Sequence, residues 1–277
     1  MSDWSLVYEG FDPEKERLRE ALCTLGNGYF ATRGAAPESE ADPIHYPGTY
    51  LAGGYNRLKT DIAGRTVENE DLVNLPNWLL LSFRMEGANW LSIRAVDILS
   101  YQQELDFRKG LLLRKFVFRD NQGRQTMVTS RRFVHMGNHH FGGLEMTITP
   151  QNWSGRISVR SGLDGRIVNA GVERYKALNN KHLQPLESAE VENDGIFLLM
   201  ETTQSKLRVA EAVRTQFFLE DSLIHVNRQL VSEPGFLAHE CSLNLKKGQE
   251  LTVEKIVALY TSRDRAISEC GQQAQAA

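Results

Sequence analysis

The chain has 277 residues, of which 41% are hydrophobic and 24% are charged, and its formal net charge is −3. This composition is typical of a soluble globular protein, and the charge gives no electrostatic reason to expect a nucleic acid or an anionic membrane as a partner. The three cysteines are far apart, so they indicate neither a disulfide framework nor a zinc site. No signal peptide and no membrane-length apolar stretch is recognisable, so we expect a cytoplasmic protein.

Two regions of the chain show little regular alternation of apolar and polar residues. Residues 34–80 are rich in Gly, Pro, Asn and Tyr and are predicted to form a long, ordered loop region. If this region packs against further protein, it should expose a large apolar patch. Residues 167–185 are predicted to form a second long connection.

Most of the remaining sequence predicts strands joined by turns. The run 111–118, the polar cluster 120–123 and the return run 124–134 have the pattern of a hairpin. Further strands are predicted over residues 141–150, 156–161, 195–203, 207–218, 223–231, 237–245 and 251–260. Many strands at this spacing, with almost no helical periodicity, indicate an all-β antiparallel sandwich or barrel with large curved sheets. In the tail, Ser262 or Ser268 has the chemistry of a helix cap, but we predict no following helix long enough to pack against the sheets.

Three segments near the N-terminus carry a more specific pattern. They are LREALCTLGNGYFATRG over 18–34, YPGTYLAGGYNR over 46–57 and VENEDLVNLPNW over 67–78. Together with LDFRKGL over 105–111 and YTSRDRAI over 260–267, they resemble the N-terminal region of glycoside hydrolase family 65. That family contains maltose, trehalose, kojibiose and nigerose phosphorylases and a few trehalose hydrolases.

The resemblance implies a domain arrangement and a reaction. Residues 1–262 would form a large antiparallel β-sandwich of the supersandwich, galactose-mutarotase-like type with few short helices. Residues 263–277 would begin a helical linker toward an (α/α)₆ barrel, which carries the general-acid Glu and the phosphate site. In the family, phosphate replaces the activated water of an inverting hydrolase. We therefore expect an accessory domain of a longer enzyme, without catalytic or metal-binding residues of its own and without a cofactor. Inorganic phosphate would be the co-substrate of that enzyme. The expected partners are an α-linked disaccharide bound by the whole enzyme, the catalytic barrel and a second copy in a homodimer.

Several residues in the three N-terminal segments suit the rim of a sugar pocket or a domain interface, because sugars and interfaces both favour aromatic, amide and guanidinium groups. The candidates are Asn27, Tyr29, Arg33, Tyr50, Tyr55, Asn56, Arg57, Glu70, Asp71, Asn74 and Trp78. For Asn27, a tight structural turn is the favoured interpretation. For the carboxylates, salt bridging or contact with the catalytic barrel is favoured over acid/base catalysis.

Two other interpretations remain open at this point. A free-standing carbohydrate-binding module would need an exposed aromatic platform. A small mutarotase-like sugar epimerase would need a histidine facing a carboxylate across a concave sheet. The closely spaced His135, His139 and His140 have the spacing of metal ligands. No further ligand type accompanies them, so we interpret this segment as a polar connection between two strands.

Overall fold

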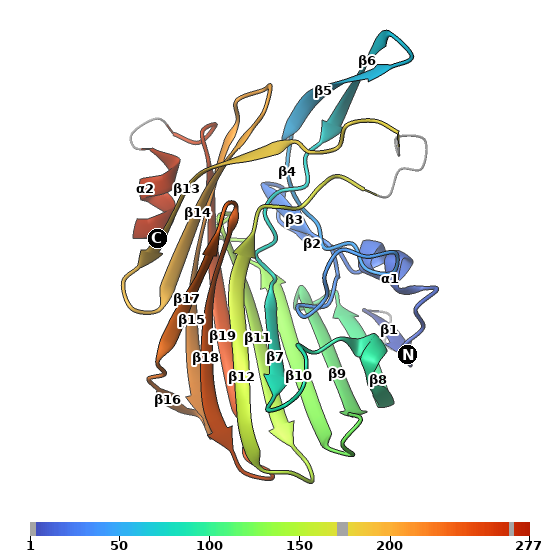
Figure 1. Cartoon of the computed structure of the whole chain (residues 1–277), viewed down its shortest axis with the longest axis vertical. Coiled ribbons are helices and arrows are strands. Elements are labelled where there is room, and N and C mark those ends of the chain that lie inside the picture. The colour runs from blue at the N-terminus through green and yellow to red at the C-terminus, as the bar shows by residue number, and fades with distance from the viewer. Residues whose placement is uncertain (1–3, 171–176, 266–268) are drawn as a thin grey trace.

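The computed structural model describes residues 4–170, 177–265 and 269–277, which fold mainly into two facing antiparallel sheets (Figure 1). The large, ten-stranded sheet has the order β1 (Ser5–Glu9), β8 (Asp97–Asp106), β9 (Leu111–Arg119), β10 (Gln125–Val134), β11 (Phe141–Pro150), β19 (Leu251–Thr261), β15 (Arg208–Leu219), β14 (Gly195–Thr202) and β13 (Leu183–Val191), with β16 (Ser222–Ile224) beside β15. The small sheet has the order β17 (Arg228–Glu233), β18 (Phe236–Leu245), β12 (Gly155–Asp164) and β7 (Leu81–Met85).

Shorter elements cover one end and one flank of the sandwich. A three-stranded sheet contains β2 (Leu25–Gly26), β3 (Phe30–Thr32) and β4 (Thr49–Leu51), and a separate hairpin contains β5 (Tyr55–Ile62) and β6 (Arg65–Leu72). The helical elements are α1 (Glu16–Leu22), the 3₁₀ turn η1 (Ile93–Ala95) and α2 (Cys270–Ala276). None of the helices within the described ranges is long and apolar enough to cross a membrane.

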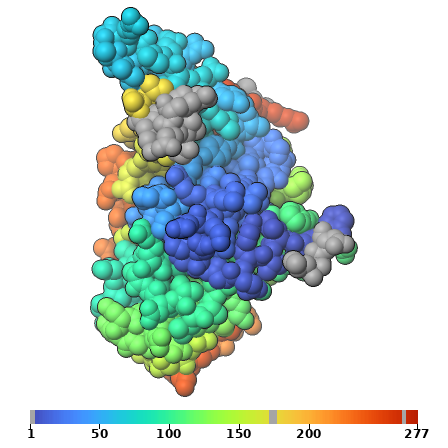
Figure 2. Space-filling view, turned by 90° about the vertical axis from the view of Figure 1, so that its right-hand side faces the viewer, coloured from blue at the N-terminus to red at the C-terminus, as the bar shows by residue number. Residues whose placement is uncertain are grey.

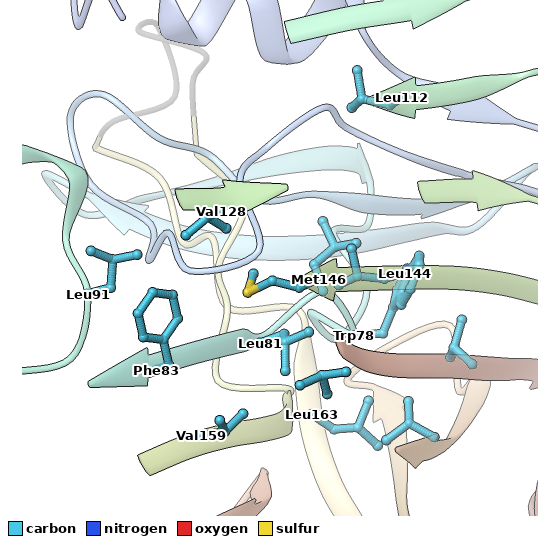
Figure 3. Packing of buried hydrophobic residues seen from close by; sticks show 14 of the residues in the cluster. Trp78, Leu81, Phe83, Leu91, Leu112, Val128, Leu144, Met146, Val159 and Leu163 are labelled. Carbon is cyan, nitrogen blue, oxygen red and sulfur yellow. The ribbon is translucent and has the colours of Figure 1, made fainter. Parts of the chain in front are cut away.

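The core lies between the two sheets and is formed by the inward-facing side chains of their strands. Met146 of the large sheet and Leu81, Phe83 and Val159 of the small sheet are all buried in one cluster, where they point toward each other (Figure 3). Full burial of such a side chain contributes about 1.5–3 kcal/mol to folding. The predicted all-β antiparallel sandwich is confirmed.

Two ionisable residues, Lys255 and Glu211, lie inside this core. Lys255 of β19 is fully buried, and its Nζ donates hydrogen bonds to the carbonyls of Leu80 at 2.9 Å and Gly162 at 2.7 Å. The lysine therefore links the large sheet to the edge of the small sheet. Burial lowers the pKa of Lys255 to about 7, and burial also raises the pKa of the enclosed Glu211 well above its usual range.

The prediction of a long loop over residues 34–80 is wrong in part, because this region contains three strands. Residues 55–72 form the hairpin β5–β6, which turns at Ala63 and Gly64, both with positive φ angles of 49° and 77°. Positive φ at both central residues is the requirement of a tight hairpin turn. Both faces of the hairpin carry mainly polar residues. The alternation of apolar and polar residues by which strands are recognised in a sequence is therefore missing.

The strand predicted over residues 223–231 is also wrong as a single element. Its first part, β16, pairs with β15 in the large sheet, whereas β17 begins at Arg228 and pairs with β18 in the small sheet. Residues 225–227 carry the chain from one sheet to the other. Both halves have strand composition, so the sequence does not show where the chain changes partner.

The tail does contain a helix that packs against the sandwich, contrary to the prediction. In α2, Cys270 and Ala274 are buried against Phe197 of β14 and Ala210 of β15, on the outer face of the large sheet. Small side chains on this face of α2 allow the short helix to lie close to the strands. The sequence signal was weak because the helix has only seven residues.

Candidate functional site

Apart from Asn74 and Trp78, the predicted rim residues fall in three places, of which the first is the turn at Asn27 between β2 and β3. The Asn27 side-chain amide donates to the carbonyls of His135 at 2.8 Å and His139 at 2.9 Å. Its Oδ1 accepts from the backbone N–H groups of Tyr29 and Phe30. The hydrogen bonds of the Asn27 amide therefore hold this turn against the connection between β10 and β11.

Tyr29 lies next to Asn27 in a cluster at the end of β19. Its ring lies 4.9 Å from that of His139 and 4.7 Å from that of His140, between centroids, and its hydroxyl donates to Asp264 at 2.6 Å. Burial and the Asp264 carboxylate raise the pKa of Tyr29. We call Tyr29, His139, His140, Asp264 and Tyr260 the exit cluster, because they surround the point where the chain leaves the last strand.

His140 of the exit cluster is held by a hydrogen bond and by ring stacking. Its Nδ1 lies 2.8 Å from the carbonyl of Leu259, so this nitrogen carries the proton and donates it. Its ring stacks on Tyr260 with centroids 3.9 Å apart. Burial lowers the pKa of His140, so the imidazole is neutral at pH 7 and can accept a hydrogen bond only through Nε2.

Arg33 and Tyr50 form the second group, packed beneath α1. The Arg33 guanidinium donates to the carbonyls of Tyr46 at 2.9 Å and Arg17 at 3.0 Å, and it lies 3.7 Å from the Glu20 carboxylate. Burial raises the pKa of Tyr50, with Tyr46 as the next contributor. The contacts of Arg33 give it a structural role in holding the N-terminal segment.

The hairpin β5–β6 forms the third group and projects from the end of the sandwich (Figures 1 and 2). Tyr55 is 49% exposed at its base. Arg57 lies across the hairpin from two carboxylates, 3.1 Å from Glu70 and 3.8 Å from Glu68, and all three side chains are about half exposed. The expected salt bridging of Glu70 is present, and at this exposure it adds little stability.

Asn56 and Asp71 lie at the buried base of the hairpin. Asn56 Oδ1 accepts from the backbone N–H groups of Gln204 and Ser205, which fixes the amide so that its Nδ2 faces Nδ1 of His182 at 3.1 Å. That His182 nitrogen therefore accepts, and burial lowers the pKa of His182. Asp71 lies 3.4 Å from His182 Nε2, close enough for attraction but not aligned for a hydrogen bond. Asn56 and His182 together anchor the hairpin to the β14–β15 turn.

The structure places two of the predicted rim residues, Asn74 and Trp78, in the interior of the domain. Asn74 is 2% exposed and its side chain bonds the backbone N–H of Thr49 and the carbonyl of Pro47. Trp78 is 0% exposed and packs in the main core, next to Gly142. Both residues follow the hairpin directly, where the chain turns inward to begin β7. Neither side chain is therefore at the surface of this domain.

The sequence analysis did not identify His182 and Asp264 as site residues. His182 is isolated in sequence, and nothing in its neighbours distinguishes it. Asp264 belongs to the segment 260–267 that carries part of the family resemblance, which was the available signal. Within the described part of the chain, no group of three or more His, Cys, Asp or Glu residues has the arrangement of a metal site.

Arg263 connects two of these places. Its guanidinium donates to the carbonyl of Gly53, immediately before β5. The exit cluster and the base of the hairpin therefore share one end of the sandwich. This end offers exposed imidazole, phenol, guanidinium and carboxylate groups, which suit contact with a sugar or with another domain.

Residues 6–277 match the glycosyl hydrolase family 65, N-terminal domain. The chain is 42% identical to an uncharacterized glycosyl hydrolase of Mycobacterium tuberculosis, over 98% of the chain and 20% of that protein. It is 29% identical to a kojibiose phosphorylase of Caldanaerobacter subterraneus subsp. tengcongensis, over 94% of the chain and 33% of the relative. It is 30% identical to a trehalose 6-phosphate phosphorylase of Lactococcus lactis, over 94% of the chain and 32% of the relative.

A solved structure shows the same fold. A putative kojibiose phosphorylase from the human microbiome superposes with a TM-score of 0.82 at 19% identity, covering 98% of this chain and 34% of that one. The chain thus spans between a fifth and about a third of the length of the proteins it matches. With the family domain extending over nearly all of its residues, the chain belongs to glycosyl hydrolase family 65 and corresponds to the N-terminal domain of that family.

Proposed function

We propose that this chain is the accessory domain of an inverting phosphorylase that cleaves an α-linked glucoside such as maltose, trehalose or kojibiose. The observation that carries the proposal is the family match over residues 6–277, combined with phosphorylase relatives that are about three times as long. In this proposal, the catalytic Glu and the phosphate site belong to the remainder of the enzyme, and inorganic phosphate is the co-substrate. A cytoplasmic location fits such an enzyme.

We assign the end of the sandwich that carries the hairpin and the exit cluster to the contact with the catalytic domain or with a second subunit. Three large apolar side chains on the hairpin are exposed to a substantial degree: Tyr55 at 49%, Ile62 at 41% and Val67 at 38%. The residue range 34–80 thus exposes apolar side chains chiefly on its projecting part. Apolar residues flanked by the charged Arg57 and Glu70 have the composition of an interface with a polar rim.

The test compares the 277-residue chain with any longer reading frame that contains it. Phosphate consumption and sugar-phosphate release are measured with maltose, trehalose, kojibiose and nigerose. Activity in the longer protein alone supports the accessory role. Turnover by the 277-residue chain would overturn it and would favour the mutarotase-like alternative, for which the buried His239 of β18, 2.9 Å from the half-exposed Glu190 of β13, is the first residue to replace.

A further inference from the structure

The large sheet ends in two edge strands, β1 and β13, which differ in how they are protected. An edge strand presents unpaired backbone groups to any strand that approaches, so proteins usually block it with proline, charges or a bulge. β13 has all three features: Pro185 lacks an N–H group, the register shifts between Pro185 and Glu187, and Glu187 and Glu190 are exposed. This edge is therefore poorly suited to a further strand.

The strand β1 lacks this protection. It lies at the end of the sheet order, and within the described ranges no strand flanks its other side (Figure 1). Its five residues, SLVYE, include no proline, and its register with β8 is regular. The one charged residue, Glu9, stands at the end of the strand, where its carboxylate accepts a hydrogen bond from Gln102 at 2.7 Å. The edge at β1 is therefore open to a partner strand.

The hydrogen-bond pattern of β1 shows which residues face the open side. The backbone N–H of Gly10 donates to the carbonyl of Tyr101 at 2.9 Å, so these two residues form a hydrogen-bonded pair. Along an antiparallel ladder such pairs alternate with pairs whose backbone groups point away from each other, so the even-numbered residues of β1 bond β8. Val7 therefore directs both its N–H and its carbonyl to the open edge, and Glu9 does the same.

Large apolar side chains gather around this edge. Trp4 and Phe107 are both more than half exposed, and Val7 is 38% exposed. The N–H of Phe107 donates to the carbonyl of Trp4 at 2.9 Å, so the two aromatic residues are neighbours. The start of the chain projects from the right-hand side of the molecule in Figure 2. Exposed apolar side chains grouped at an open strand are typical of an interaction surface.

The sequence of β1 is complementary to itself in an antiparallel arrangement. A two-fold axis at Val7 places Val7 opposite its own counterpart, Leu6 opposite Tyr8, and Ser5 opposite Glu9. Apolar side chains then meet apolar ones, and the Glu9 carboxylate meets a hydroxyl group. Like charges directly opposite each other destabilise a strand pair, and this register contains none. A second copy of the chain therefore fits this edge, because one patch serves both subunits of a two-fold dimer.

We propose that β1 pairs with β1 of a second copy of this chain, so that the two large sheets continue across a two-fold axis at Val7. The N–H and carbonyl of Val7 bond those of its counterpart, and Trp4 lies opposite Gly10, which has no side chain to obstruct the indole. The contact is small, so the association is reversible and weak. It lies away from the hairpin β5–β6 (Figure 1), and it does not rest on the proposed phosphorylase role.

Sedimentation equilibrium of the 277-residue chain over a concentration series tests the dimer. The variant Val7→Pro removes the central N–H donor without removing a hydrogen bond to β8, because that N–H faces the open edge. We expect a monomer–dimer equilibrium for wild type, and self-association that is at least about tenfold weaker in Val7→Pro at an unchanged unfolding temperature. Val7→Thr keeps the N–H and the branched side chain, so this matched control should still dimerise. A wild-type chain that stays monomeric up to about 1 mM, or equal association of wild type and Val7→Pro, would overturn the proposal.

Cysteine cross-linking tests the register and does not depend on a proline variant that folds. In the proposed dimer the two copies of residue 7 are directly opposite, with Cα atoms about 5.5 Å apart, which is within reach of a disulfide. The two copies of residue 9 are separated by four residues along the strands, or roughly 13 Å. The native cysteines Cys23, Cys241 and Cys270 are buried. Mild oxidation should link Val7→Cys into dimers and leave Glu9→Cys monomeric, whereas equal cross-linking of the two variants, or none in either, would contradict the proposed register.

Discussion

The hairpin β5–β6 and the segment 73–80 that follows it are neighbours in sequence but opposite in environment. On the hairpin, Arg57 and Glu70 pair in water with half of each side chain exposed. In the following segment, Asn74 and Trp78 are enclosed, and Asn74 has its amide bonded at both ends. The hairpin leaves the body of the protein, whereas segment 73–80 enters the core and leads into β7.

This difference shows that amino-acid composition alone does not distinguish a surface binding site from a buried, hydrogen-bonded corner. Asn, Trp, Arg and carboxylates in a turn-rich region have the chemistry of a sugar site, and they have equally the chemistry of a buried hydrogen-bonded corner. The deciding property is whether the polar atoms already have partners within the protein. Asn74 has them, whereas Arg57 and Glu70 of the hairpin pair with each other at the surface.

The largest expected effect comes from Trp78→Ala. A fully buried indole in the main core is replaced by a methyl group, which should lower the free energy of unfolding by about 3–5 kcal/mol. Urea unfolding followed by circular dichroism measures this change. Trp4→Ala, at a residue that is 52% exposed, is the control and should change stability far less. Similar losses in the two variants would contradict the placement of Trp78 in the core.

Asn74→Ala should have the next largest effect. The substitution leaves the N–H of Thr49 and the carbonyl of Pro47 buried without their side-chain partner, which should lower the free energy of unfolding by about 2–4 kcal/mol. The same unfolding assay applies, with Asn121→Ala in the exposed β9–β10 turn as the control. A loss near zero would mean that Asn74 is not part of the cooperative fold.

The variant Lys255→Met tests whether the core next to segment 73–80 contains a titrating group. The Lys255 ammonium group donates to the carbonyl of Leu80. Its pKa is about 7 in the folded chain, below the ordinary value of 10.5 expected in the unfolded chain. Between these pH values the unfolded state binds more protons at this residue, so Lys255 makes stability rise with pH by about 1.4 kcal/mol per unit. Lys255→Met should remove that rise.

The measurement is urea unfolding of wild type and Lys255→Met from pH 7 upward, with Lys246→Met as an exposed control. As the pH rises, the free energy of unfolding of Lys255→Met should fall further below that of wild type. The difference between the Lys246→Met control and wild type should stay constant. Glu211, whose pKa is raised by burial, acts in the opposite direction above its ordinary value, so it is left intact in both proteins. Parallel curves for Lys255→Met and wild type would show that Lys255 does not titrate in this window.

The sandwich itself was predictable because its strands obey a simple period. The run around β11 alternates apolar and polar residues, so one of its faces must be buried. The runs around β9 and β10 are rich in strand-forming residues and flank a polar turn that ends in Gly123. The hairpin β5–β6 escaped recognition because its charged residues, Arg57, Lys59 and Glu68 among them, outnumber its apolar residues. The exchange of sheets between β16 and β17 was not predictable, since pairing partners are chosen by tertiary contacts.

The candidate site was predictable in part for the same physical reason. The family resemblance selected segments that the fold does bring to one end of the sandwich, as the contact from Arg263 to Gly53 shows. It could not separate Asn74 and Trp78 from Tyr55 and Arg57, because burial depends on residues far away in sequence.

The smallest expected effect on stability comes from Arg57→Ala on the hairpin. The substitution removes ion pairs with Glu68 and Glu70 that are about half exposed, so the free energy of unfolding should change by less than about 0.5 kcal/mol. Lys59→Ala, which removes a single contact to Glu68 at 3.3 Å, is the matched control and should behave alike. A loss of more than about 1 kcal/mol for Arg57→Ala alone would make the hairpin part of the cooperative core, and its surface could then no longer be assigned to a partner.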